Sequence, residues 1–204
     1  MQEHGPCGYD SVRSYLDENQ WLKNVQSVTA AAQINAAVFP TIGGAGCGSQ
    51  AMEANPHRTR DEGAFYASFL LAVEKTAAQG GRPCAGLQPL YYTSPNNSSS
   101  TRYAAIHPRF HWPIGPPAET KPVSEYRLPA LHACCTYARR FSTGLVLINP
   151  SWNQTDSIDL GVIYPSHQYA DPGNQIDTGG QFPSVPKAVR RLSVPPQTAF
   201  ILLV

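Results

Sequence analysis

The residues best suited to acid–base chemistry lie near the start of the chain. Glu3 and His4 precede the segment 11–32, where apolar side chains recur at the spacing of a helix. A carboxyl group can donate a proton, accept one or attack a substrate carbon. The imidazole beside it can hydrogen-bond to the carboxylate or to a substrate hydroxyl. The competing interpretation is that Glu3 has no catalytic role, because the first residues of a chain are commonly frayed.

Three aromatic residues are candidates for ligand binding. Tyr91 and Tyr92 end a predicted strand at 87–92, and Trp112 lies in the proline-rich segment that follows. Aromatic rings can stack on apolar ligand faces, so these residues could bind substrate. The alternative is packing, in which Trp112 fixes its loop onto the folded core. Packing is the preferred interpretation for Trp112, and more strongly so for the two tyrosines.

The cysteines and histidines do not form a recognisable metal-binding pattern. The chain has five cysteines and no Cys-x-x-Cys pair. Cys134 and Cys135 are adjacent in a predicted β run, where neighbouring side chains point to opposite faces. His107 and His111 stand four apart, but the prolines around them argue against a helix. The glycine-rich loop 43–48 lacks the phosphate-binding pattern. We therefore predict no metal site and no cofactor.

Composition excludes two classes of partner. The net charge is +1, and no basic run exceeds two residues, which argues against nucleic-acid binding. No apolar stretch approaches the roughly 18 residues of a membrane span. The first residues do not form a signal peptide, while three sequons, at Asn96, Asn97 and Asn153, lean towards secretion. The compartment stays undecided, although the parent protein of such a chain could be extracellular.

The first part of the chain alternates between helix and strand. A helix is predicted at 11–32, a strand at 34–39, a second helix from Thr59 or Asp61, and a strand at 87–92. This order is typical of an α/β domain. Two such units cannot close a barrel, which needs eight strands. We therefore expect a partner chain or a missing N-terminal segment to cover their apolar surface.

The second part of the chain follows a β pattern. Residues 131–141 and 145–149 predict a hairpin, and apolar side chains alternate from Ile158 to Tyr164. Val189, Leu192 and the closing run 198–204 predict further strands. A long loop rich in proline, serine and asparagine separates this part from the first. The predicted boundary lies near residue 130.

Several segments resemble a known enzyme family. The closest match is Arg-Arg-Phe-Ser-Thr-Gly-Leu-Val-Leu-Ile-Asn-Pro at 139–150, and looser matches occur at 3–5, 21–22, 36–40, 64–72 and 194–204. They resemble barrel-type glycoside hydrolases, in the group described as hypothetical glycosyl hydrolases. Together the matching pieces cover about half of the chain. Only the segment 139–150 is specific.

The resemblance implies a fold and a reaction. The fold would be the last strands of a (β/α)8 barrel with a long proline-rich loop over 1–130, followed by an antiparallel β-sandwich over 131–204. The parent would hydrolyse O-glycosidic bonds in a polysaccharide or glycoconjugate. Glu3 would be its acid/base or nucleophile, with His4, Tyr91, Tyr92 and Trp112 around the carbohydrate substrate.

Two observations keep an alternative open. Glycoside cleavage usually needs two carboxyl groups, and no second acid follows the predicted strands at 34–39 and 87–92. Glu53, the nearest, lies deep in a loop. Whether the chain is itself an enzyme is therefore undecided. The alternative is a non-catalytic carbohydrate-binding or structural module.

Overall fold

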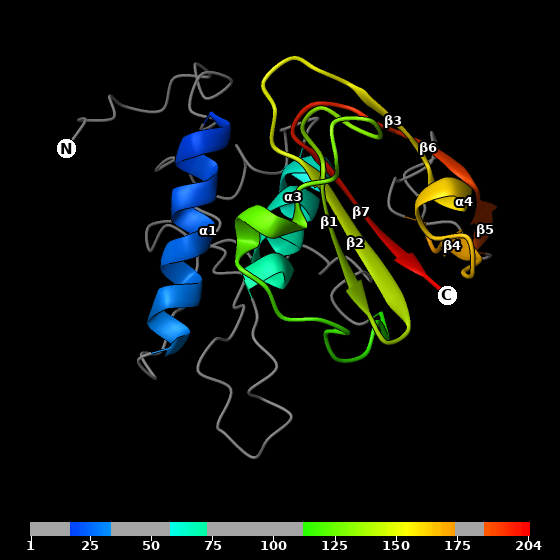
Figure 1. The fold of residues 1–204 in the computed structure, drawn as a ribbon, viewed down its shortest axis with the longest axis horizontal. Helices are drawn as coiled ribbons and strands as arrows, with labels where there is room; N and C mark the ends of the chain where they lie inside the picture. The colour runs from blue at the N-terminus through cyan, green and yellow to red at the C-terminus, as the bar shows by residue number, and fades with distance from the viewer. Residues whose placement is uncertain (1–16, 34–57, 73–111, 174–185) are drawn as a thin grey trace, which may run out of the picture.

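The computed structural model describes residues 17–33, 58–72, 112–173 and 186–204 (Figure 1). Its helices are α1 (Glu18–Gln33), α3 (Arg58–Ala72), the 3-10 helix η4 (Val123–Tyr126) and the short α4 (Leu160–Ile163). Its strands are β1 (Tyr137–Phe141), β2 (Gly144–Asn149), β3 (Asp156–Asp159), β4 (Tyr169–Asp171), β5 (Lys187–Val189), β6 (Arg191–Val194) and β7 (Thr198–Leu203).

The strands form two antiparallel sheets. One sheet has the order β1-β2-β7-β4-β5, and the other pairs β3 with β6. Every strand pair within the described residues is antiparallel. The predicted α/β fold with a partial (β/α)8 barrel is therefore wrong, because a barrel of that kind is built from parallel strands. The helices that suggested it pack on an antiparallel sheet instead.

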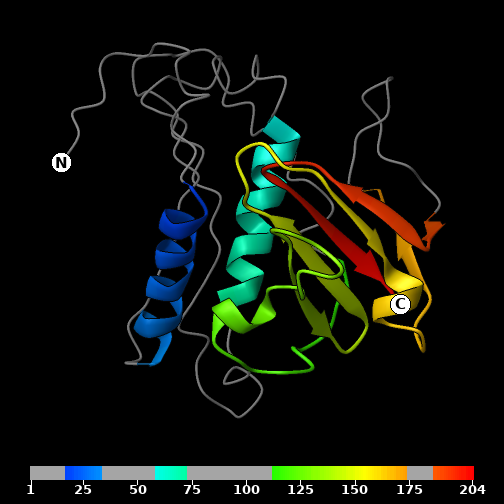
Figure 2. The same ribbon diagram turned by 45° about the horizontal axis from the view of Figure 1, so that its top comes forward.

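The molecule has three layers around the larger sheet (Figures 1 and 2). Helices α1 and α3 cover one face, where they share a hydrophobic core with Tyr137, Val146 and Ile201. Strands β3 and β6 and helix α4 cover the other face, over a second core that includes Leu145 and Leu147. Both faces of the sheet are thus buried within one chain, which explains why every residue of β2 is buried.

Both predicted helices are present, but α1 begins at Glu18 rather than at residue 11, and residues 11–16 lie outside the described part of the chain. Helix α1 begins at Glu18, after Asp17, whose carboxylate accepts a hydrogen bond of 2.9 Å from the Gln20 backbone N–H. That contact satisfies one of the free donors at a helix start. Helix α3 buries Ala67, Leu70 and neighbouring apolar residues against the sheet. Apolar residues of both helices pack in a core within the same chain. The expected partner chain or missing segment over the first part of the chain stays a prediction. The predicted strands at 34–39 and 87–92 lie outside the described residues.

The β part differs from its sequence pattern in two places. The hairpin is present, but its first strand begins at Tyr137 rather than at residue 131. The alternation from Ile158 to Tyr164 continues as strand only to Asp159, because residues 160–163 form a helical turn. Ile158 of the strand and Leu160 of the helical turn nevertheless pack in the same core, so the alternate burial extends beyond the end of the strand.

Gly144 opens β2 where no side chain fits. A Cβ atom there would lie 2.9 Å from Ile114 Cγ2 and 2.9 Å from the backbone oxygen of Leu202. The hairpin turn at Ser142 and Thr143 is packed against the segment preceding it, since Thr143 N–H donates to the Ile114 carbonyl at 3.0 Å. The Ser-Thr-Gly turn therefore lies in close contact with the segments that contain Ile114 and Leu202.

Among the helices that the structure describes, none combines the length and the apolar character needed to cross a lipid bilayer. The expectation of no membrane-spanning helix is confirmed to that extent.

Candidate functional site

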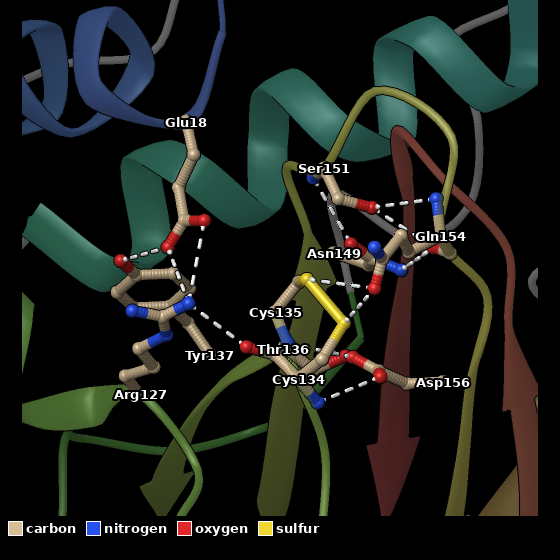
Figure 3. Close-up of polar contacts among 10 residues, drawn as sticks. All are labelled: Glu18, Arg127, Cys134, Cys135, Thr136, Tyr137, Asn149, Ser151, Gln154 and Asp156. Atoms are coloured by element: carbon tan, nitrogen blue, oxygen red, sulfur yellow. Dashed lines mark hydrogen bonds and ion pairs between the residues drawn. A yellow bond between two sulfur atoms is a disulfide. The ribbon is translucent and has the colours of Figure 1, made fainter. Parts of the chain in front are cut away.

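The chemically most reactive group in the described residues is a disulfide between the adjacent residues Cys134 and Cys135 (Figure 3). The pair lies in a bend just before β1. We name residues 134–136 the cysteine turn. The prediction that these two side chains point to opposite faces of a strand is wrong, because the strand begins only at Tyr137. In the bend, both sulfur atoms lie on one side of the backbone.

Asp156, at the start of β3, holds the cysteine turn in place. Its Oδ1 accepts a hydrogen bond from the Cys134 backbone N–H at 2.8 Å. Its Oδ2 accepts one from the Cys135 N–H at 3.1 Å and one from the Thr136 hydroxyl at 2.6 Å. Asp156, Cys135 and Thr136 are all buried. Such charge-assisted bonds in a buried site are stronger than bonds between neutral groups.

The loop between β2 and β3 brings an amide to the two sulfurs. Gln154 Oε1 lies 3.0 Å from Cys134 Sγ and 4.0 Å from Cys135 Sγ. Asn149, at the end of β2, positions this loop, since its Nδ2 donates to the Gln154 carbonyl at 2.7 Å and to the Val194 carbonyl at 2.9 Å. Ser151 Oγ donates to the same Gln154 carbonyl at 2.9 Å. The Asn-Pro-Ser turn therefore places Gln154.

A second polar cluster joins the cysteine turn to helix α1. Tyr137 donates from its hydroxyl to Glu18 Oε1 at 2.8 Å, and Arg127 Nη2 lies 3.4 Å from the same oxygen. Arg127 Nη2 also donates to the Cys134 carbonyl at 2.8 Å. The Trp21 ring packs on Tyr137, with 4.8 Å between ring centroids. Figure 3 shows Glu18, Arg127 and Tyr137 beside the disulfide.

The surroundings of Tyr137 predict a loss of stability at alkaline pH. Burial raises the pKa of Tyr137 above that of a free tyrosine, and the hydrogen bond to Glu18 and the charge of Glu18 raise it further. The unfolded chain then loses its phenolic proton at lower pH than the folded chain does. The free energy of unfolding should therefore fall as the pH rises above about 10.

Replacing Tyr137 with phenylalanine removes this phenol, so the alkaline loss of stability should become smaller. Urea unfolding of the wild type and the variant, at several pH values between neutral and strongly alkaline, measures the alkaline loss of stability in each. Tyr164 also has a raised pKa, chiefly because of burial, so a part of the loss will remain. An unchanged pH dependence in the variant would contradict this account of Tyr137.

A further buried cation lies on the helix-facing side of the sheet. Arg139 Nη1 donates to the carbonyls of Leu70 and Leu71, each at 2.9 Å, in the last turn of α3. Its Nη2 donates to the Glu119 carbonyl at 3.2 Å. The guanidinium lies over the Tyr126 ring, 5.0 Å from its centroid. The carbonyls at a helix end lack partners within the helix, so Arg139 satisfies two of them.

Of the predicted site residues, only Trp112 belongs to the described part of the chain. It is partly buried against the core between the helices and the larger sheet. Its role in substrate binding stays a prediction. Glu3, His4, Tyr91 and Tyr92 lie outside the described residues, so the structure does not say whether they meet. The sequence analysis missed Asp156 and Gln154, and the adjacent cysteines were the one signal near them.

Comparison of this chain with protein-family models, with curated proteins and with solved structures found no match.

Proposed function

We propose that the described residues form a non-catalytic structural module of a glycoside-hydrolase-like protein. The module's two-sided sheet would hold the helical part of the chain in a fixed position. The resemblance of residues 139–150 to hypothetical glycosyl hydrolases supports the parent's class. The buried contact between Arg139 and the end of α3 carries the structural role, because it ties the sheet to a helix far away in the sequence.

Several residues of the segment 139–150 have structural contacts, which supports this proposal. Arg139 binds α3, and Phe141 packs in the helix-facing core, 5.6 Å from the guanidinium. Gly144 leaves room for Ile114 and the Leu202 carbonyl. Asn149 positions the following loop. The resemblance therefore rests on residues that build the sheet, and a shared scaffold does not by itself transfer a reaction.

The partners of the described acids also support a structural role. Asp156 accepts three hydrogen bonds from the cysteine turn. Glu18 binds Tyr137 and Arg127, Glu119 pairs with Lys121 at 2.7 Å, and Asp159 pairs with Arg191 at 2.9 Å. A glycosidase needs two carboxyl groups facing one sugar bond from about 5–9.5 Å apart. These four acids instead bind neighbouring groups of their own chain.

Hydrolysis of glycosides by the full chain tests this proposal. We expect the chain to release no more reducing sugar from a panel of polysaccharides and aryl glycosides than a buffer blank does. The Glu3→Gln variant should behave like the wild type. Hydrolysis by the wild type that Glu3→Gln lowers at least tenfold would overturn the proposal and make Glu3 catalytic.

A further inference from the structure

We propose that the cysteine turn is a redox-gated metal site. In the reduced protein, Cys134, Cys135 and Asp156 would bind one thiophilic divalent ion such as Zn²⁺, and the disulfide would close the site. This inference stands independently of the proposed structural role, because it uses none of the contacts between the sheet and α3.

The ligand atoms are already close together. One atom from each of Cys134, Cys135 and Asp156 lies within 4.8 Å of the other two. In a tetrahedral zinc site with bonds of about 2.3 Å to sulfur and 2.0–2.2 Å to oxygen, ligand atoms stand roughly 3.5–3.8 Å apart. Opening the S–S bond and moving the side chains by about 1 Å would therefore give metal-binding distances.

The surrounding contacts hold the site in shape. A carboxylate has about four lone-pair positions, and Asp156 uses three of them for the cysteine turn, which leaves one for a metal ion. Gln154 Oε1, 3.0 Å from Cys134 Sγ, is placed to supply a fourth donor atom. In Figure 3 this oxygen faces both sulfurs. Hydrogen bonds that fix a ligand in this way commonly change metal affinity 10–100-fold.

The chemistry balances with a small dithiol as the reductant. Exchange with that dithiol opens the Cys134–Cys135 bond, giving two protein thiols and the oxidised reductant. Binding of Zn²⁺ then forms two Zn–S bonds and one Zn–O bond and releases the two thiol protons. Two thiolates and one carboxylate leave the occupied site with one negative charge. Arg127, which donates to the Cys134 carbonyl, offers a nearby positive charge.

The site is also reachable from solvent. Gln154 is exposed, and Cys134 lies nearer the surface than the buried Cys135 and Asp156. A metal ion or a small thiol could thus approach from the Cys134 side, while the buried carboxylate and thiol close the inner half of the site.

The test uses the full chain with Cys7, Cys47 and Cys84 changed to serine, so that Cys134 and Cys135 supply the only thiols. Zn²⁺ binding is followed by calorimetry, and Cd²⁺ binding by its sulfur-to-metal charge-transfer absorption. We expect the reduced protein to bind one ion and to release protons. The oxidised protein should bind neither ion at this site. Cys134→Ser should weaken the charge-transfer band, because only the Cys135 thiolate remains, and Asp156→Asn should weaken binding about tenfold or more.

Two controls keep the result interpretable. Glu125→Gln removes an exposed carboxylate of η4, and it should leave affinity unchanged. Gln154→Ala alters the site without touching the bonds from Asp156, so it tests the ligand set even if Asp156→Asn fails to fold. No binding by the reduced protein would overturn the proposal, as would equal affinity in the oxidised protein. If both Asp156→Asn and Gln154→Ala bind the ion as tightly as the parent protein, the two thiolates alone hold it, and the proposed ligand set is wrong.

Discussion

Replacing Arg139 with methionine is expected to lower the free energy of unfolding by about 3 kcal/mol or more. The substitution keeps an unbranched apolar stem but removes the guanidinium. The carbonyls of Leu70, Leu71 and Glu119 then lose a charged donor. Unsatisfied buried acceptors cost free energy, and no water replaces the donor easily because Arg139 is only 1% exposed. Chemical unfolding monitored by tryptophan fluorescence measures the change.

The loss should be concentrated where α3 meets the sheet. The Arg139→Met substitution is expected to accelerate amide hydrogen exchange more in α3 than in β2. Arg140→Met is the matched control, since Arg140 is the next residue of β1, points to the other face of the sheet and is partly exposed. Its effect should be within about 0.5 kcal/mol. Equal losses in the two variants would refute the role assigned to Arg139.

Replacing Asp156 with alanine is expected to lower the free energy of unfolding by about 3 kcal/mol or more. Asp156 is 5% exposed, and its carboxylate accepts hydrogen bonds from two backbone N–H groups and one hydroxyl. Its removal leaves three buried donors without this acceptor, and a cavity next to the cysteine turn. Unfolding curves of the oxidised protein, in which the disulfide is intact, measure the loss.

The control for Asp156 is Glu125, whose side chain is exposed to solvent. Glu125→Ala, in the exposed face of η4, should change the free energy of unfolding by no more than about 0.5 kcal/mol. The Asp156→Ala protein should also react faster with small dithiols, because Asp156 anchors the backbone of both cysteines. A variant as stable as the wild type would mean that the cysteine turn does not depend on Asp156.

Local sequence patterns predicted the two long helices and the hairpin of the described residues. The apolar spacing in α1 and α3 repeats every three to four residues, and each turn of a helix imposes that spacing wherever the helix packs. The apolar run of β2 and the Ser-Thr-Gly turn before it predicted the hairpin with β1. The absence of a long apolar stretch also predicted correctly that no helix in the described residues could cross a membrane.

Sequence patterns failed where the answer depended on distant segments. The helix–strand alternation of the first part predicted an α/β domain, and the family resemblance implied a partial parallel barrel. Helices α1 and α3 instead pack on antiparallel strands that come a hundred residues or so later. A helix presents the same apolar stripe to a parallel or an antiparallel sheet, so its sequence cannot distinguish the two. The candidate residues Glu3, His4, Tyr91 and Tyr92 stay predictions, because they lie outside the described part.

The sequence by itself determined which residues are apolar, which described segments form helices and a hairpin, and that two cysteines are neighbours. Only the tertiary structure decided that β2 is buried on both faces, that Arg139 binds carbonyls in the last turn of α3, and that Asp156 and Gln154 flank the cysteines. The reason is physical. Propensity and periodicity act over a few residues, whereas these contacts exist only once segments 20 to 70 positions apart have packed together.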